Sequence, residues 1–235
     1  MNIPQPQRQY TEGEIQIEQA NFITKVYAWM FGALTLTGFV AVWSASTPAV
    51  IEAVFSNKWV FYGLLIGEFL CVAYLISVIQ KISAQVAILI FMAYAALNGL
   101  TLSVIFLIFT SESIATTFFI TAGTFGVMSA YGYYTKKDLT SIGNLAFMAL
   151  IGLIIASVVN IFFASELIYW ITTYAGILIF VALTAYDTQK IKEMNIIGNE
   201  GTDEDKKEAI MGALTLYLDF INLFLYLLRL FGRRK

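Results

Sequence analysis

Residues 209–231 read AIMGALTLYLDFINLFLYLLRLF, an apolar run that contains both an aspartate and an arginine. As a helix this run is long enough to cross about 30 Å of hydrocarbon. On a helical wheel its small and polar positions fall within about 100° of arc: Gly212, Thr215, Asp219, Asn222, Tyr226 and Arg229. A helix that faces lipid would not gather its polar groups on one stripe. The pattern therefore predicts a helix that faces protein or a water-filled path, or one held to its neighbours by hydrogen bonds.

The whole chain has the composition of a polytopic membrane protein. Of its 235 residues, 59% are hydrophobic and 13% are charged, and the mean hydropathy is +0.74. Six further apolar runs precede the quoted one, at 22–42, 59–79, 84–109, 114–134, 142–163 and 167–186. We therefore predict an all-α polytopic membrane protein with seven transmembrane helices over residues 22–231. A polar cytoplasmic tail (1–21) and a basic C-terminal tail (232–235) would flank this domain.

The absence of histidine and the single cysteine narrow the possible chemistry. Histidine-ligated zinc or haem and serine–histidine or cysteine–histidine nucleophiles are excluded. Cys71 alone provides neither a disulfide framework nor a thiolate metal site. Any response to pH must then come from carboxylates, and any metal bound by side chains should be an oxygen-preferring cation such as Ca²⁺.

The distribution of lysine and arginine predicts the orientation. A cytoplasmic N-terminus leaves only Lys58 on the outside before the C-terminal tail. It places the following residues on the cytoplasmic side: Arg8, Lys25, Lys81, Lys136, Lys137, Lys190, Lys192, Lys206 and Lys207. With a seventh span, the basic C-terminal tail would lie outside, against the rule that positive charges stay inside. The last segment therefore either spans the membrane despite this rule or re-enters and returns to the same side. We favour spanning.

The longest connection, residues 190–208, is charged and contains Gly198 and Gly201. Within it Thr202 precedes three acidic residues, which is the pattern of a helix N-cap with acids in the first turn. The seventh helix is therefore expected to begin in water before it enters the membrane.

Three acids lie in or at the edge of apolar runs: Glu68, Asp187 and Asp219. A carboxylate in a bilayer costs a few kcal/mol, so such acids are candidate functional residues. Asp187 and Asp219 could share a proton or bind a cation, although Asp187 alone could be a solvated acid at a helix end. Their depths differ, because Asp219 lies roughly 15 Å into its run and Asp187 lies near the cytoplasmic boundary. They can meet only if the seventh run is offset toward the cytoplasm or the sixth helix reaches deeper.

Glu68, in the middle of the second run, has two interpretations. It could be a third ligand or a proton-relay group, or a protonated acid that is hydrogen-bonded to a neighbouring helix.

Five segments together resemble the bacterial branch of the Bax inhibitor-1 (transmembrane Bax inhibitor motif) family. They are YAALNGLTLS (94–103), TAGTFG (121–126), YGYYTKKDL (131–139), TAYDTQ (184–189) and ALTLYLDFINLF (213–224). The resemblance implies seven helices with the last in the centre of the other six. It also implies a Ca²⁺ leak across the bacterial inner membrane, gated by an aspartate pair that senses pH and contacts the ion. By motif, that pair is Asp187 and Asp219.

Accessory positions of such a pathway would be Glu68, Asn222, Arg229 and Lys81. Lys81 is the nearest counterpart of a basic latch that the family can bring toward the pair. The family often has a proline at the position of Val104, so a kink expected there loses its usual cause. Physically, two carboxylates within about 4 Å should share one proton, and its loss leaves repulsion that a divalent cation or a helix movement can relieve.

Two other functions are alternatives. An intramembrane aspartyl protease of the presenilin type is disfavoured, because Asp219 follows Leu-Tyr-Leu rather than Gly-x-Gly and no Pro-Ala-Leu element is present near the end. We therefore expect no enzymatic activity. The second is an interaction protein that modulates a membrane quality-control protease through residues 1–21 or 190–208. The expected partners are the lipid bilayer, protons, Ca²⁺ and possible membrane proteins, with no nucleic acid and no other cofactor.

Overall fold

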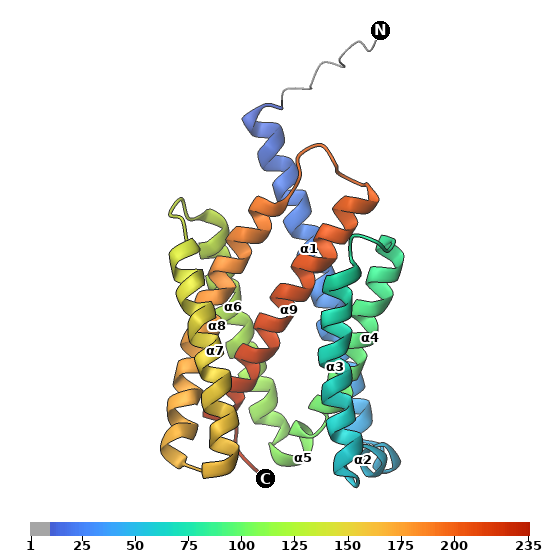
Figure 1. Ribbon diagram of the computed structural model, residues 1–235, viewed down its shortest axis with the longest axis vertical. Coiled ribbons are helices and arrows are strands. Elements are labelled where there is room, and N and C mark those ends of the chain that lie inside the picture. Colours follow the sequence, from blue (N-terminus) through green and yellow to red (C-terminus); the bar gives the residue numbers. More distant parts are fainter. Residues whose placement is uncertain (1–9) are drawn as a thin grey trace.

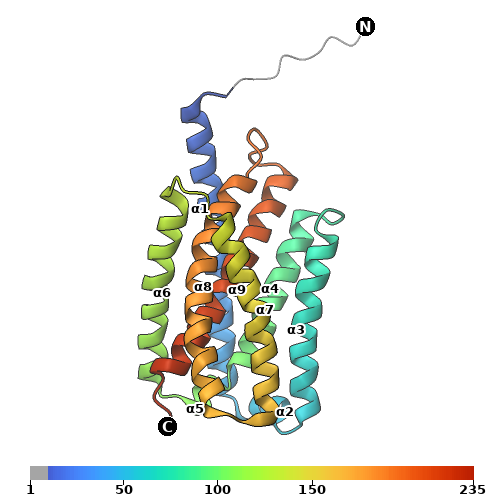
Figure 2. The same cartoon turned by 60° about the vertical axis from the view of Figure 1, so that its left-hand side comes forward.

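The computed structural model describes residues 10–235 as a bundle of seven long helices and two short ones (Figures 1 and 2). The long helices are α1 (Glu12–Ala45), α3 (Lys58–Val78), α4 (Ala84–Leu102), α6 (Ser111–Tyr134), α7 (Thr140–Phe163), α8 (Glu166–Met194) and α9 (Asp203–Phe231). The short ones are α2 (Pro48–Phe55), which was not predicted, and α5 (Ile105–Ile108). Seven helical spans are long and apolar enough to cross a membrane. The predicted all-α, seven-span architecture is confirmed.

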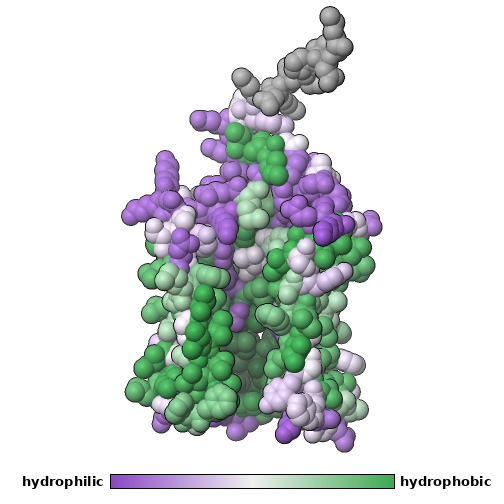
Figure 3. Space-filling view, in the orientation of Figure 1, coloured by the Kyte–Doolittle hydropathy of each residue, from purple (hydrophilic) through white to green (hydrophobic). Residues whose placement is uncertain are grey.

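Helix α9 lies in the centre of the bundle. It packs against α1, α4, α6 and α8, whereas α3 packs on α4 and α7 packs on α8. About 67% of the most apolar window of α9 is buried inside the protein, compared with 11% for α3 and for α7. The outer helices present large apolar side chains on the surface, as lipid contact requires (Figure 3). The central position implied by the family resemblance is therefore confirmed.

Helix α1 begins well before its apolar run. Thr11 and Glu14 form a capping box, in which the Thr11 hydroxyl accepts from the Glu14 N–H and the Glu14 carboxylate accepts from the Thr11 N–H at 2.8 Å. The predicted tail at 1–21 is therefore helical from Glu12 onward, because hydropathy marks where a helix meets lipid rather than where it starts. Residues 1–9 of that predicted tail lie outside the described residues.

The third span breaks between α4 and α5 although the family proline is replaced by Val104. Ser103 ends α4, with its hydroxyl donating to the Leu100 carbonyl at 2.6 Å. One turn earlier, Gly99 lies so close to α1 that a Cβ would be 2.7 Å from the Thr37 carbonyl oxygen. Ser103 and Val104 nevertheless keep helical backbone dihedrals, so the interruption is a local change in hydrogen bonding beside a tight helix crossing.

Helix α9 is continuous, and it ends at the opposite end of the bundle from the start of α1 (Figure 1). The last segment therefore spans, and the re-entrant alternative is wrong.

The basic residues after α9 do not form a free tail. Arg234 pairs with Phe109 in an isolated antiparallel bridge, and the Lys235 N–H donates to the Ile108 carbonyl at 2.9 Å. The C-terminus is thus fastened to the α5–α6 connection.

The α8–α9 connection is shorter than predicted, because α8 continues to Met194 and α9 starts at Asp203. Gly198 and Gly201 have φ of 91° and 84°, a backbone conformation that favours glycine. Thr202 caps α9 as expected. Asp205, in the first turn, accepts from Lys25 Nζ at 2.8 Å and from the Gly201 N–H at 2.8 Å. This contact ties α1 to the start of the central helix.

The α6–α8 contact depends on Gly132, where an added Cβ would overlap the carbonyl oxygen of Ala185. We expect Gly132→Ala to destabilise the protein by about 1–3 kcal/mol, because a packed backbone has to move. The measurement is thermal unfolding in detergent. Gly123→Ala on the same helix is the matched control, since a Cβ there meets nothing within 4 Å. Equal unfolding temperatures for the two variants would contradict the close contact.

Candidate functional site

Helices α8 and α9 run antiparallel in a register that brings Asp187 and Asp219 together. Along α9, Gly212 lies beside Ile191, and a Cβ at Gly176 would be 2.6 Å from the Tyr226 ring. Ile191 is near the end of α8, whereas Gly212 is well inside α9, so the first turns of α9 extend past α8. Asp187 is about two turns from the end of α8 rather than at its end. The two aspartates therefore meet for both of the predicted reasons. The seventh helix is offset relative to the sixth, and the sixth helix extends further than its apolar run.

The two carboxyl groups face each other within hydrogen-bonding reach. Asp219 is 5% exposed, and Asp187 is half-buried. Oδ2 of Asp219 is buried and has no hydrogen-bond donor. Two ionised carboxylates cannot donate to each other, so a proton held between them would satisfy this oxygen. The geometry would allow the two carboxyl groups to share one proton.

The pair lines a cavity of about 630 Å³ between α7, α8 and α9. Thr215, Asn222 and Tyr226 of the polar stripe line it as well, with apolar residues of α7 on the opposite wall. Figure 3 shows a furrow at this side of the molecule, with hydrophilic atoms visible between apolar flanks. The stripe predicted from the helical wheel thus faces a cavity rather than lipid.

A basic side chain, Lys190, shares this cavity with the pair. Its amino group lies 5.6 Å from the centre of the Tyr186 ring, and its charge acts on Asp187. Lys81 is exposed after the end of α3 and does not line the cavity. The structure therefore does not bring Lys81 to the pair. The spacing from Asp187 to Lys190, one turn on the same helix, is the sequence signal that could have placed Lys190 beside it.

A second cavity of about 440 Å³ adjoins the first and shares Asn222 and Tyr226 with it. The Tyr226 ring stacks on Phe180 at 5.9 Å between centroids and fills the space beside Gly176. Arg229 lines the second cavity, with its guanidinium 4.4 Å from the centre of the Tyr169 ring. Tyr226 therefore forms part of the partition between a carboxylate-lined cavity and an arginine-lined one.

Glu68 lies apart from both cavities. Its carboxylate accepts from the Thr101 hydroxyl and from Asn98 Nδ2 at 3.4 Å. The Tyr217 hydroxyl donates to Asn98 Oδ1 at 3.2 Å and lies 2.7 Å from the Thr37 hydroxyl. Tyr217 and Asp219 point to opposite faces of α9, because two residues turn a helix by about 200°. The structure agrees with the second interpretation of Glu68, an acid hydrogen-bonded to a neighbouring helix.

Comparison with known proteins identifies the family of this chain. A family model described as an inhibitor of apoptosis-promoting Bax1 matches residues 19–235, which include every residue of the carboxyl pair and both cavities. The inner membrane protein YbhL of Escherichia coli (strain K12) is 53% identical over 215 residues, covering 91% of this chain and 92% of YbhL. The chain belongs to the Bax inhibitor-1 family.

More distant Bax inhibitor-1 relatives match over a similar extent. An uncharacterized protein of Borreliella burgdorferi is 42% identical over 91% of this chain and 92% of its own length. The uncharacterized membrane protein SpyM3_0260 of Streptococcus pyogenes is 34% identical over 95% of this chain and 96% of its own. The match therefore covers the whole bundle, and the membrane character inferred from composition agrees with it.

The carboxyl pair should make stability depend on pH. Two unit charges about 4 Å apart repel by a few kcal/mol at an effective dielectric constant of 20, so full ionisation of the pair should weaken the α8–α9 contact. Asp219→Asn replaces one charge with an amide that can donate to Asp187. We expect this variant to unfold several degrees above the wild type at alkaline pH and close to it at acidic pH. Thermal unfolding in detergent across pH measures the difference, and parallel pH profiles would contradict a directly coupled pair.

Proposed function

We propose that this protein forms a proton-controlled leak pathway for Ca²⁺ across the bacterial inner membrane, with Asp187 and Asp219 as its gate. The observation that supports it most is the placement of two facing carboxyl groups on the central helix and its neighbour, at the wall of a polar cavity. Family membership adds support, because the resemblance implies this activity. The absence of histidine leaves the carboxylates as the candidate groups for a response to pH.

The gate would have two states. With one proton on the pair, α8 and α9 remain in contact through a shared hydrogen bond. Without it, the repulsion has to be relieved by a cation or by separation of the helices. Because α9 also packs on α1, α4 and α6, a shift of α9 at Asp219 would be transmitted through the bundle.

The site suits a passing ion more than a resident one. Ca²⁺ takes six to eight oxygen ligands, and the described residues hold no group of three or more acidic, histidine or cysteine side chains that could bind a metal. Two carboxylates with the Asn222 amide oxygen, the Thr215 hydroxyl and water from the cavity would hold Ca²⁺ only transiently. Lys190 would compete with the ion for the same carboxylates.

The charges support an orientation for the pathway. The excess of lysine and arginine on the N-terminal side of the bundle supports a cytoplasmic N-terminus. The name of YbhL as an inner membrane protein supports the same membrane for this chain. The cavity with Asp187 and Lys190 would then lie toward the cytoplasm, and the one with Arg229 toward the opposite side.

Reconstitution into liposomes tests the gate. We expect Ca²⁺ influx, reported by an entrapped indicator, to depend on pH for the wild type and to lose that dependence in the Asp187→Asn, Asp219→Asn double variant. Glu68→Gln is the matched control, since it alters a buried carboxylate outside the cavity. Flux that keeps its pH dependence in the double variant would refute the gate. No flux in any variant would favour the interaction-protein alternative, and cleavage of a membrane peptide would favour the protease.

Tyr226 should limit the rate of flux, because its ring stands between the two cavities. We expect Tyr226→Ala to raise the leak several-fold, since it joins the cavities. Tyr226→Phe keeps the ring and should leave the leak near that of the wild type. The same liposome assay measures both variants, and an unchanged leak in Tyr226→Ala would place the barrier elsewhere.

A further inference from the structure

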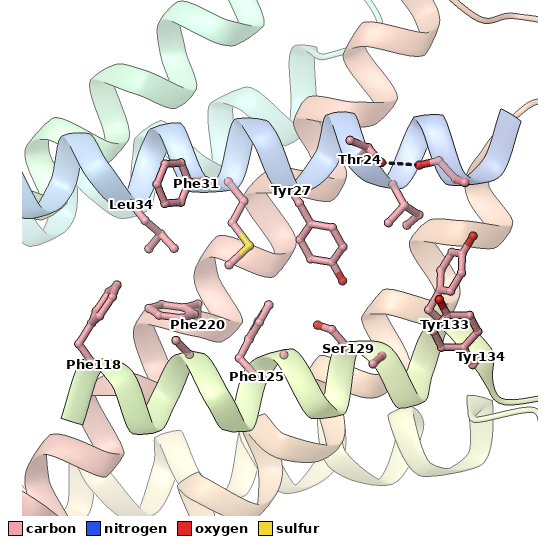
Figure 4. Close-up of a pocket in the computed structure, with 16 residues that line it drawn as sticks. Thr24, Tyr27, Phe31, Leu34, Phe118, Phe125, Ser129, Tyr133, Tyr134 and Phe220 are labelled. Carbon is pink, nitrogen blue, oxygen red and sulfur yellow. Dashed lines mark hydrogen bonds between the residues drawn. The ribbon is translucent and has the colours of Figure 1, made fainter. Parts of the chain in front are cut away.

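A deep apolar groove of about 720 Å³ runs between α1 and α6 (Figure 4). Side chains from the two helices form its walls, among them Phe31 and Leu34 on α1 and Phe118 and Phe125 on α6. Its floor includes Phe220 of α9, whose ring lies 5.5 Å from that of Phe118 and 5.4 Å from that of Phe125. The groove therefore reaches from the outer surface to the central helix.

The groove is not closed by packing between its two walls. Among the described helices, α1 packs chiefly on α4 and α9, and α6 packs chiefly on α8 and α9. The α6 wall carries Ala122, Gly126 and Ala130, a spacing that usually allows a second helix to approach closely. Here a Cβ at Gly126 would meet nothing within 4 Å. This part of the α6 wall is therefore open among residues 10–235.

One end of the groove is lined by tyrosines and lies beside basic residues. Tyr133 and Tyr134 line this end, and Lys192 Nζ donates to the Tyr133 carbonyl at 3.1 Å and lies 5.0 Å from the centre of its ring. Lys136 and Lys137 follow α6 directly.

These three lysines have no acidic partner within 4 Å among residues 10–235. In contrast, Lys25 and Lys207 form ion pairs with acidic side chains. The acids nearest to the three lysines in sequence are Asp138 and Glu193, both exposed. The Asp138 carboxylate accepts from the Thr140 N–H at 2.8 Å. The mouth of the groove therefore carries positive charge that is not neutralised by ion pairs.

We propose that this groove binds an acyl chain of an anionic phospholipid, with the phosphate headgroup at Lys136, Lys137 and Lys192. A long apolar channel that ends at unpaired cations matches an amphiphile with a hydrocarbon tail and a negative head. Basic pockets between transmembrane helices are known to favour such lipids, and the volume is within the roughly 300–1,000 Å³ of small-ligand sites. A partner helix would fill the apolar part but would leave the three lysines without counter-charges. The proposal does not depend on Ca²⁺ conduction.

Native mass spectrometry of the purified full chain tests the proposal, with phosphatidylglycerol and phosphatidylcholine of identical acyl chains added separately. We expect retained phosphatidylglycerol and at least tenfold weaker retention of phosphatidylcholine. Glycerophosphoglycerol, which has the headgroup but no acyl chains, should not be retained. Equal retention of the two phospholipids, or retention of the headgroup compound alone, would overturn the proposal.

Two glycine variants locate the bound chain. Gly126→Phe should fill the groove and reduce phosphatidylglycerol retention about tenfold. Gly123→Phe is the matched control, because Gly123 is on the same helix, outside the groove, and also has open space around its Cβ. Equal retention by the two variants would overturn the groove as the site.

A third variant tests the headgroup contact. In Lys136→Gln, Lys137→Gln, Lys192→Gln, the two phospholipids should be retained equally, and a preference for phosphatidylglycerol that survives these changes would overturn the basic mouth as the headgroup site. Thermal unfolding in detergent checks that each variant is folded. If the triple lysine variant unfolds, the comparison of Gly126→Phe with Gly123→Phe still decides the proposal.

Discussion

A helix in the centre of a membrane bundle has to satisfy its polar side chains within the protein, because neither lipid nor bulk water is in reach. Helix α9 meets this constraint largely with its own backbone. The Thr215 hydroxyl donates to the Met211 carbonyl at 3.0 Å, and Asn222 Nδ2 donates to the Leu218 carbonyl at 2.8 Å. Arg229 lies on the Tyr169 ring. Asp219 cannot be satisfied by a backbone carbonyl or by an aromatic ring, because a carboxylate accepts hydrogen bonds. The backbone N–H groups in the middle of a helix are already bonded to backbone carbonyls. The partner of Asp219 has to come from α8.

This requirement explains why the register of α8 and α9 is fixed so closely. Gly176 leaves room for the Tyr226 ring on one side of the pair, and Gly212 lets Ile191 approach on the other. The two contacts set the height at which Asp187 meets Asp219. On the opposite face, Tyr217 bonds to Asn98 and Thr37, so α9 is held against α4 and α1 at the same level. A movement of α9 that separates the carboxyl pair would also strain this second network.

The sequence predicted the fold well because lipid imposes a simple rule on hydropathy. Seven apolar runs became seven helical spans, and the helical wheel placed Asp219 on an inward stripe. Helix ends were less predictable. The first turns of α1, from Glu12, and the last turns of α8, up to Met194, are polar. Their composition predicts a tail or a loop, but both segments are helical.

Contacts between helices were the hardest to predict. Lys190 lies one turn after Asp187 in the sequence, but only the packing of α8 on α9 and α7 shows that it lines the cavity and that Lys81 does not. The break after Ser103 lacks its usual proline, and it accompanies a close approach to Thr37 of α1, which local sequence does not reveal. The network of Thr37, Asn98 and Tyr217 gave no signal in the sequence, because each residue alone is ordinary in a transmembrane helix.

The carboxyl pair and the proposed lipid groove lie on different sides of α9 but touch it at consecutive residues, Asp219 and Phe220. A lipid can shift the state of the pair only if it binds one position of α9 more tightly than another. Phe220 forms the floor of the groove together with Phe118 and Phe125, so any rotation of α9 that separates Asp219 from Asp187 would also change the groove. Linkage then requires the reverse effect, in which the protonation state of the pair alters lipid affinity by the same factor. Such a rotation of the central helix would make the two sites energetically dependent, even though none of residues 10–235 lines both.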